Sequence, residues 1–210
     1  MSKLPNPPGT ELLCRIGAEP ARVAAGRLLF RIYFRGGDHP AGWREFRHFG
    51  PLAGARFDHH PEPRGLCEGY GVLYAATEIK TCVAEVFQTD RTIGVRRREP
   101  WLVGFELREE IELLDLTSNW PTRAGASMKI SSGPRPTCRR WSRAVYEAYP
   151  EIAGLFYSSS MNANRPAVAL YERAEPLLAT APSLNVPLSH PGLTTELDRI
   201  ATDLGYSLVP

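Results

Sequence analysis

Short apolar runs and longer runs with helical spacing follow one another along this chain. Runs rich in aromatic and branched residues are typical of strands, and they occur over residues 28–34, 72–76, 101–107, 111–116, 152–157, 167–171 and 206–209. Apolar residues spaced three and four apart predict helices over 78–89, 138–149 and 195–204. The elements mix irregularly, without repeated strand–helix–strand units. The pattern therefore predicts an α+β fold: one compact mixed domain with short strands and a few packed helices.

The predicted helices carry signals at their ends. Thr77 is placed to cap the first helix, with Glu78 at its positive end. Thr195 and Asp198 have the spacing of a capping box for the last helix, and Gly205 is expected to end it. These signals support helices at both positions.

The length of 210 residues is enough for one sizeable core. We expect an N-terminal extension over 1–25 and the main domain over 26–175. A linker and an amphipathic helix over 176–210 are expected to pack on the same domain. Prolines and glycines gather in the expected loops, which are 1–10, 36–42, 61–71, 121–137 and 176–192.

The composition argues against several classes of protein. A net charge of +2 is too small to indicate nucleic acid or an anionic membrane as a partner, and we interpret the basic run Arg96–Arg98 as a solvated loop. No apolar run approaches the ~20 residues of a membrane helix, and residues 1–10 lack the apolar core of an export signal. We therefore expect a cytoplasmic protein. The four cysteines are widely spaced and predicted to be reduced thiols.

Two local motifs do not support a cofactor or metal site. Gly69-Tyr70-Gly71 precedes a strand and lacks a third glycine, so it is not a dinucleotide-binding loop. Asp58-His59-His60 has no further ligands at metal-binding spacing. We expect neither a metal nor a tightly bound cofactor.

Three polar side chains stand on or beside segments that are predicted to be buried. Arg31 lies in the strand over 28–34, Glu85 in the first helix, and Ser158 and Ser159 at the end of a strand. At about 100° per residue, Glu85 falls about 60° beyond the buried Cys82, at the edge of the apolar stripe. Because charge is costly to bury unless it is paired or used, these placements favour one shared pocket.

Each of these residues also has a simpler interpretation. Arg31 fits the exposed face of an edge strand, Glu85 fits a solvated helix position that pairs with Lys80 or Arg91, and Ser158–Ser160 fits a polar turn. The surrounding motifs favour the shared pocket.

These motifs, in this order, resemble the RES family, which is named for an Arg, a Glu and a Ser. The matching elements are Leu29-Phe30-Arg31-Ile32-Tyr33, Gly54-Ala55-Arg56-Phe57, Val72-Leu73-Tyr74-Ala75, Ala84-Glu85-Val86, Gly154-Leu155-Phe156-Tyr157-Ser158-Ser159 and Ala167–Tyr171. The family more commonly has Gly-Arg-Trp-Asn where this chain has Gly54–Asp58. The family's Tyr-x-Ser spacing selects Ser159 as the functional serine, with Ser158 as the second choice.

The resemblance implies a fold similar to ADP-ribosyltransferases and an enzyme that uses NAD as its substrate. Family members cleave the nicotinamide–ribose bond by phosphorolysis, with inorganic phosphate as co-substrate, or by hydrolysis, and some are ADP-ribosyltransferases. Many are toxins of toxin–antitoxin pairs with a helix-turn-helix antitoxin. A non-catalytic binding module is a third hypothesis, and self-association is left open.

The resemblance also assigns roles to residues. It places Arg31, Glu85 and Ser159 in catalysis. Further contacts with NAD are expected from Tyr33, Arg56, Tyr74, Tyr157 and Ser158. Glu85 suits the sugar cation that forms when nicotinamide leaves, and the arginines suit the diphosphate or an attacking phosphate.

Overall fold

Short strands and helices alternate irregularly over residues 4–210, the part of the chain that the computed structural model describes. The helices are α1 (Thr10–Ile16), α2 (Ile79–Val86), α3 (Trp120–Arg123), α4 (Arg135–Ala148) and α5 (Thr194–Leu204). The strands are β1 (Pro20–Val23), β2 (Leu28–Phe34), β3 (Phe49–Gly50), β4 (Gly65–Leu66), β5 (Val72–Ala76), β6 (Thr92–Gly94), β7 (Pro100–Glu106), β8 (Ile111–Asp115), β9 (Gly154–Ser158), β10 (Pro166–Tyr171), β11 (Leu184–Pro187) and β12 (Ser207–Val209).

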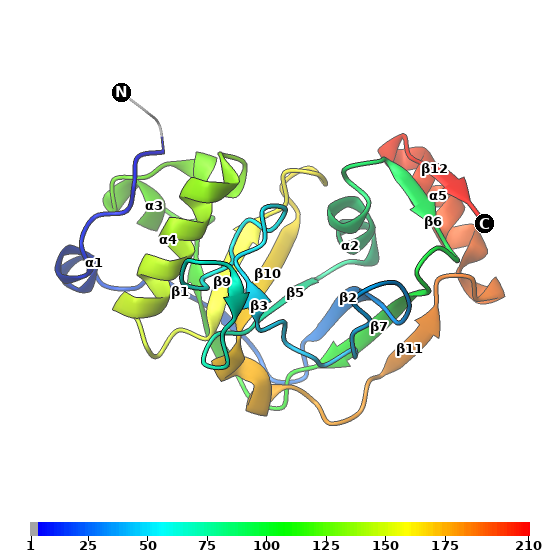
Figure 1. The fold of residues 1–210 in the computed structure, drawn as a ribbon, viewed down its shortest axis with the longest axis horizontal. Coiled ribbons are helices and arrows are strands. Elements are labelled where there is room, and N and C mark those ends of the chain that lie inside the picture. The colour runs from blue at the N-terminus through cyan, green and yellow to red at the C-terminus, as the bar shows by residue number, and fades with distance from the viewer. Residues whose placement is uncertain (1–3) are drawn as a thin grey trace.

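An eight-stranded mixed sheet runs through the molecule in the order β1-β8-β9-β10-β5-β2-β7-β11. Its pairs are antiparallel except β8 and β9, which run parallel. The three helices α1, α3 and α4 gather at one end, and α2 and α5 lie toward the other (Figure 1). The predicted α+β class is confirmed, with the helices packed on a sheet of mixed strand direction.

The sheet opens between β2 and β5. Each of these strands is fully paired on its other side, β2 with β7 and β5 with β10, but they meet each other only through Phe30 and Ala76. Beyond that pair, the open edge of β5 is taken by a loop residue, because Arg47 bridges to Val72. The divergence leaves space in the middle of the sheet, bounded by strands on both sides.

Both faces of the sheet are covered by apolar side chains. Alternate residues of β10 show the division: Ala169 and Tyr171 join the core beneath the helices, whereas Val168 and Leu170 join a second core on the opposite face. Side chains of a strand alternate between faces, so a continuous apolar run such as 167–171 fits a strand that is buried on both sides.

The predicted strands over 28–34, 72–76, 101–107, 111–116, 152–157, 167–171 and 206–209 are all present, within two residues at each end. Five shorter strands were missed, namely β1, β3, β4, β6 and β11. Strands of two to four residues carry too little periodicity to be recognised.

Two predicted caps are wrong. Thr77 does not cap α2, because its hydroxyl donates to the carbonyl of Pro166 on the neighbouring strand, and Glu78 occupies the N-cap with extended backbone. The Thr195–Asp198 capping box does not form either, because α5 continues from a 3₁₀ turn over Pro191–Leu193. The predicted stop of α5 is confirmed: Gly205 adopts the left-handed conformation, with φ of 65°.

The terminal segments take part in the same sheet and core. β1, within the expected N-terminal extension, pairs with β8, and β11, within the expected linker, pairs with β7. The C-terminal helix α5 contributes the buried residues Leu197 and Ile200 to the core beneath the helices, and Asp203 forms an ion pair with Lys80 on α2.

Among residues 4–210, no helix combines the length and the apolar character needed to cross a membrane.

Candidate active site

A cleft of about 1180 Å³ lies where β2 and β5 diverge. Its floor includes Ile32 and Ala76 from the two strands, and α2 contributes Thr81, Cys82 and Glu85. The loop between β2 and β5, including the hairpin of β3 and β4, forms another wall. Cofactor-sized ligands commonly bind in clefts of several hundred cubic ångströms, so this one has room for a dinucleotide.

Glu85 and Ser159 meet in a direct hydrogen bond. The hydroxyl of Ser159 donates to Oε1 of Glu85 at 2.5 Å, and the same hydroxyl accepts the backbone N–H groups of Met161 and Asn162, each at 3.2 Å. Ser159 is fully buried and Glu85 lines the cleft. The buried serine therefore orients the carboxylate of Glu85 through a hydrogen bond on the protein side of the cleft wall. Lys80 pairs with Asp203 instead of Glu85.

Arg31 lies on an interior strand and lines the cleft. Its Nη1 donates to the carbonyls of Trp43 and Glu45 at 2.9 and 3.0 Å. Burial lowers the pKa of the Arg31 guanidinium to about 10, against the opposing effect of Glu45, so it still carries its charge at neutral pH. The edge-strand interpretation is wrong, because β7 lies beyond β2. Arg31 anchors the loop that covers the gap in the sheet.

The buried carboxylate of Asp58 holds three residues that line the cleft. It accepts hydrogen bonds from Nη2 of Arg47 at 2.6 Å, from the backbone N–H of Leu52 at 2.8 Å and from the hydroxyl of Tyr74 at 3.2 Å. Asp58 is fully buried, whereas Arg47, Leu52 and Tyr74 all line the cleft. Burial and then the nearby Asp58 raise the pKa of Tyr74 well above its ordinary value, so its phenol stays neutral.

Arg56 and Tyr157, which the resemblance assigned to contacts with NAD, also line the cleft. Arg56 donates from Nη1 to the carbonyl of Gly133 at 2.5 Å. The following residue, Phe57, packs its ring against that of Tyr157 with centroids 4.7 Å apart. Burial, and next the charge of Glu85, raise the pKa of Tyr157 well above its ordinary value. Both tyrosines thus present neutral hydroxyls and aromatic surface.

The cleft carries more positive than negative charge. Two glutamates line it, Glu45 and Glu85, and the lining arginines are Arg31, Arg47, Arg56, Arg64, Arg98 and Arg135. A concave surface with one dominant sign of charge attracts ligands of the opposite sign. The arrangement suits an anionic ligand with oxygens that guanidinium groups can bind in pairs.

Two of the predicted ligand residues do not line the cleft. Tyr33 packs in the core on the opposite face of the sheet, and its hydroxyl donates to Asn185 at 2.9 Å. Ser158 is buried at the end of β9, where its backbone pairs with Pro166. The structure brings Ser159, and not Ser158, to Glu85.

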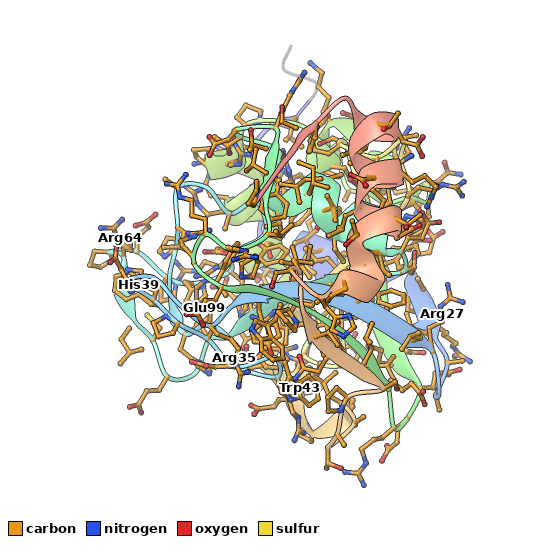
Figure 2. The ribbon with its side chains drawn as sticks, turned by 90° about the vertical axis from the view of Figure 1, so that its right-hand side faces the viewer. Arg27, Arg35, His39, Trp43, Arg64 and Glu99 are labelled. Atoms are coloured by element: carbon orange, nitrogen blue, oxygen red, sulfur yellow. The ribbon has the colours of Figure 1, made fainter. Side chains whose placement is uncertain are left out.

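Part of the cleft rim projects from the body of the protein. His39 and Arg64, which line the cleft, lie at the left of Figure 2, and Arg27 lies at the opposite side of the molecule. The rim hairpin exposes two large apolar side chains, because the paired residues Phe49 and Leu66 are 45% and 71% exposed.

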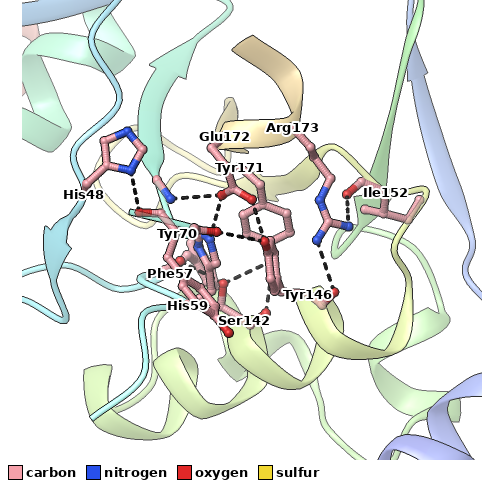
Figure 3. Close-up of polar contacts among 12 residues, drawn as sticks. His48, Phe57, His59, Tyr70, Ser142, Tyr146, Ile152, Tyr171, Glu172 and Arg173 are labelled. Carbon is pink, nitrogen blue, oxygen red and sulfur yellow. Dashed lines mark hydrogen bonds and ion pairs between the residues drawn. The ribbon is translucent and has the colours of Figure 1, made fainter. Parts of the chain in front are cut away.

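A second polar cluster lies behind the cleft wall (Figure 3). The carboxylate of Glu172 contacts Nε2 of His59 at 3.1 Å and accepts from the hydroxyl of Tyr146 at 2.5 Å and from the backbone N–H of Gly71 at 2.9 Å. Burial raises the pKa of Glu172, but these hydrogen bonds outweigh it and lower the pKa to about 2. Burial lowers the pKa of His59. The cluster ties His59 and Gly71 to α4 and to Glu172, the first residue after β10.

The Asp58-His59-His60 motif thus serves as an anchor. Asp58 faces the cleft residues and His59 faces Glu172. No group of three or more His, Cys, Asp or Glu side chains within residues 4–210 is arranged to hold a metal ion.

Sequence reasoning missed several cleft residues. Gln88 follows Glu85 at a spacing of three, where helix side chains are neighbours, so this one had a local signal. Arg47, Arg64, Arg98 and Arg135 had none, because loop and helix-end arginines are usually solvated and only the path of the chain brings them to the cleft.

Comparisons with known proteins agree with this architecture. The RES domain family model matches residues 28–191, which is well over half of the chain. The fold is similar to a chain in the crystal structure of the M. tuberculosis MbcT-MbcA toxin-antitoxin complex, with a TM-score of 0.55 and 16% sequence identity over 85% of this chain and 92% of that one. No curated protein matches the sequence. On the extent of the family match, the chain belongs to the RES domain family.

Proposed function

We propose that this protein cleaves the nicotinamide–ribose bond of NAD. The observation that carries the proposal is the placement of Glu85, which Ser159 holds in a cleft that arginines otherwise dominate. An oriented carboxylate in a cleft with more arginines than glutamates matches a substrate that joins a positively charged sugar centre to a diphosphate. Membership of the RES family and the size of the cleft support the same conclusion.

The chemistry needs no general acid. Nicotinamide is a cation in NAD, and when the bond to the ribose breaks its nitrogen takes the bonding electron pair and leaves as a neutral ring. Positive charge then develops on the sugar, as in glycoside cleavage. Glu85 stabilises that charge and holds a ribose hydroxyl with the oxygen that Ser159 leaves free. Its catalytic value comes from being fixed before the reaction begins.

The arginines have a different task. Arg56 and Arg135 line the cleft together with Glu85 and form no ion pair among the described residues. Their guanidinium groups suit the diphosphate of NAD. They also suit an attacking inorganic phosphate, whose oxygen would form the new bond to the anomeric carbon. We therefore include phosphorolysis beside hydrolysis, in which water forms that bond and releases a proton.

Tyr74 and Tyr157 suit the flat nicotinamide ring. Both line the cleft, and their pKa values are raised by burial. Their rings offer a stacking surface, and neutral phenols do not repel the negatively charged diphosphate. Ser159 is not a nucleophile in this scheme, because it is fully buried and does not line the cleft, and its hydroxyl serves to orient Glu85.

We further propose that the protein is a toxin whose partner is an antitoxin with a helix-turn-helix domain. Family membership supports this assignment. The exposed apolar residues at the cleft rim, Phe49 and Leu66, offer surface for such a partner.

Product analysis of an NAD digest tests the enzymatic proposal. The purified protein should release nicotinamide, together with ADP-ribose when only water is present or its phosphorylated form when phosphate is added. Transfer of labelled ADP-ribose to a macromolecule would replace this proposal with an ADP-ribosyltransferase. Stable NAD under both conditions would contradict cleavage and favour a binding module.

A further inference from the structure

Gln88 lies between Glu85 and Arg135, and all three residues line the cleft. It lies two residues beyond the end of α2 and lines the cleft together with Glu85 and Arg135. Its Nε2 donates to the backbone carbonyl of Glu85 at 2.7 Å and lies 3.4 Å from the carboxylate oxygen Oε2. Its Oε1 accepts from Nη2 of Arg135 at 3.2 Å.

The contact with Arg135 fixes which way the amide of Gln88 points. A guanidinium group has only donors, so the amide oxygen must face Arg135 and the NH₂ group must face Glu85. The reverse orientation would set a donor against a donor and an oxygen against a carboxylate. Arg135 therefore fixes which end of the Gln88 amide faces the Glu85 carboxylate, although Arg135 has no hydrogen bond to Glu85 itself.

Glu85 is consequently held from two sides. Ser159 accepts two backbone N–H groups, which directs its proton to Oε1 of Glu85. Gln88 approaches the other oxygen, Oε2, at a distance that is long for a hydrogen bond. The first oxygen is therefore fully engaged, and the second is oriented while it can still accept a hydrogen bond from a ligand.

We propose that Gln88 is a positioning residue for Glu85 and that Arg135 acts through it by fixing its amide. The proposal rests on the proposed function, in which Glu85 is the carboxylate that stabilises the sugar cation. Gln88 keeps this carboxylate turned toward the cleft and offers a neutral donor to its charged form.

Other ionisable groups near Glu85 also affect the pH dependence that a test at Gln88 would measure. Cys82 on the same helix, Tyr157 on β9 and Tyr206 after α5 are close enough for Glu85 to raise their pKa values, although burial is the larger cause for each. Arg56 faces Tyr157, and Arg135 is reached through Gln88. Of these groups, only Arg135 has a hydrogen bond to the Gln88 side chain that is affected when Gln88 is replaced.

Two variants at Gln88 separate positioning from general structure. Gln88→Met keeps the length of the side chain and removes the donor, so kcat for NAD should fall about 2- to 10-fold, the scale of one ordinary hydrogen bond, with little change in KM. Gln88→Glu places a like charge beside Glu85, so protonation of the carboxylate becomes easier. The acid limb of kcat/KM should then move up by about one pH unit.

A matched control comes from the next residue. Thr89 is exposed and does not line the cleft, so Thr89→Glu adds the same charge without facing Glu85 and should leave kcat and the pH profile close to wild type. Arg135→Gln should reproduce the kcat loss of Gln88→Met, because the amide of Gln88 is then free to turn, whereas a loss of diphosphate binding raises KM. The double variant should lose little more kcat than either single variant.

The outcomes distinguish this proposal from the proposed function. Wild-type kcat in Gln88→Met, or an acid limb in Gln88→Glu that does not move relative to Thr89→Glu, would overturn the positioning role while NAD cleavage stands. A wild-type protein that does not cleave NAD would overturn the function itself. Should Gln88→Met not fold, judged by its thermal midpoint, Gln88→Glu and Arg135→Gln carry the test.

Discussion

Ser159 and Glu85 are separated by 74 residues in the chain, and their side chains share a 2.5 Å hydrogen bond at the edge of the cleft. The bond joins the end of β9 to the last turn of α2. It also converts a helix-edge glutamate into a fixed carboxylate, because Ser159 is itself locked by two backbone N–H groups. Five predictions follow from this contact and from the others that shape the cleft.

Replacing Glu85 by Gln should reduce the rate of NAD cleavage by about 10²- to 10³-fold, the usual loss when one preorganised electrostatic group is removed. The change keeps the shape of the side chain, so the thermal midpoint should stay near that of wild type. Glu78→Gln is the control, because Glu78 is the N-cap of the same helix and pairs at the surface with Arg165. Equal rates for Glu85→Gln and wild type would point to a different carboxylate.

Ser159→Ala should reduce kcat and also lower the free energy of unfolding by about 1–3 kcal/mol, because two buried N–H groups lose their acceptor. Nicotinamide release and urea unfolding measure the two effects. Ser160→Ala, at an exposed neighbouring position, should show neither. A fully active Ser159→Ala would mean that Glu85 keeps its orientation without the serine.

Arg31→Met should destabilise the protein by about 1–3 kcal/mol, because the carbonyls of Trp43 and Glu45 lose a charged donor. We expect KM for NAD to rise as well, since the loop that these carbonyls belong to forms a cleft wall. Denaturant unfolding and steady-state kinetics measure both. Arg22→Met, at an exposed arginine of β1, serves as the comparison, and equal stability of the two variants would contradict an anchoring role.

Asp58→Ala should cost about 3 kcal/mol of folding free energy, since removal of one partner from a buried ion pair leaves the other uncompensated. A double-mutant cycle with Arg47→Met isolates the pair. The double variant should be less damaged than the sum of the single variants. Strict additivity would mean that Asp58 acts through Leu52 and Tyr74 alone.

Glu172 should make folding stability sensitive to acid. The unfolded chain takes up a proton at the ordinary carboxyl pKa of 4.5, whereas the folded protein resists protonation of Glu172 until about pH 2. The free energy of unfolding should therefore fall as the pH drops through this window.

Glu172→Gln should lack this part of the decline. His60, whose pKa burial lowers to about 4, produces an earlier decline below about pH 6.5 in both proteins. Urea unfolding across both pH ranges separates the two contributions. Parallel stability curves below pH 4.5 would show that Glu172 is not the group responsible.

The order of elements was accessible from the sequence because it depends on local patterns. The run over 28–34 alternates its side chains between two cores, and the spacing around Cys82 sets Glu85 at the edge of the buried stripe of α2. The helix was nevertheless predicted to continue to residue 89, whereas it ends at Val86. There the side chain of Gln88 satisfies the carbonyl of Glu85, one of the acceptors that a helix end leaves free.

By itself, the sequence determined the positions of the longer strands and helices, the class of fold and the resemblance to the RES family, which rests on ordered local motifs. Only the tertiary structure decided which side chains meet. It selected Ser159 over Ser158, turned Tyr33 to the opposite face, and made Asp58 an anchor for Arg47 and Tyr74. The physical reason is range: periodicity reports which face of an element is buried, but contacts between distant residues depend on where the sheet divides and how the loop crosses the gap.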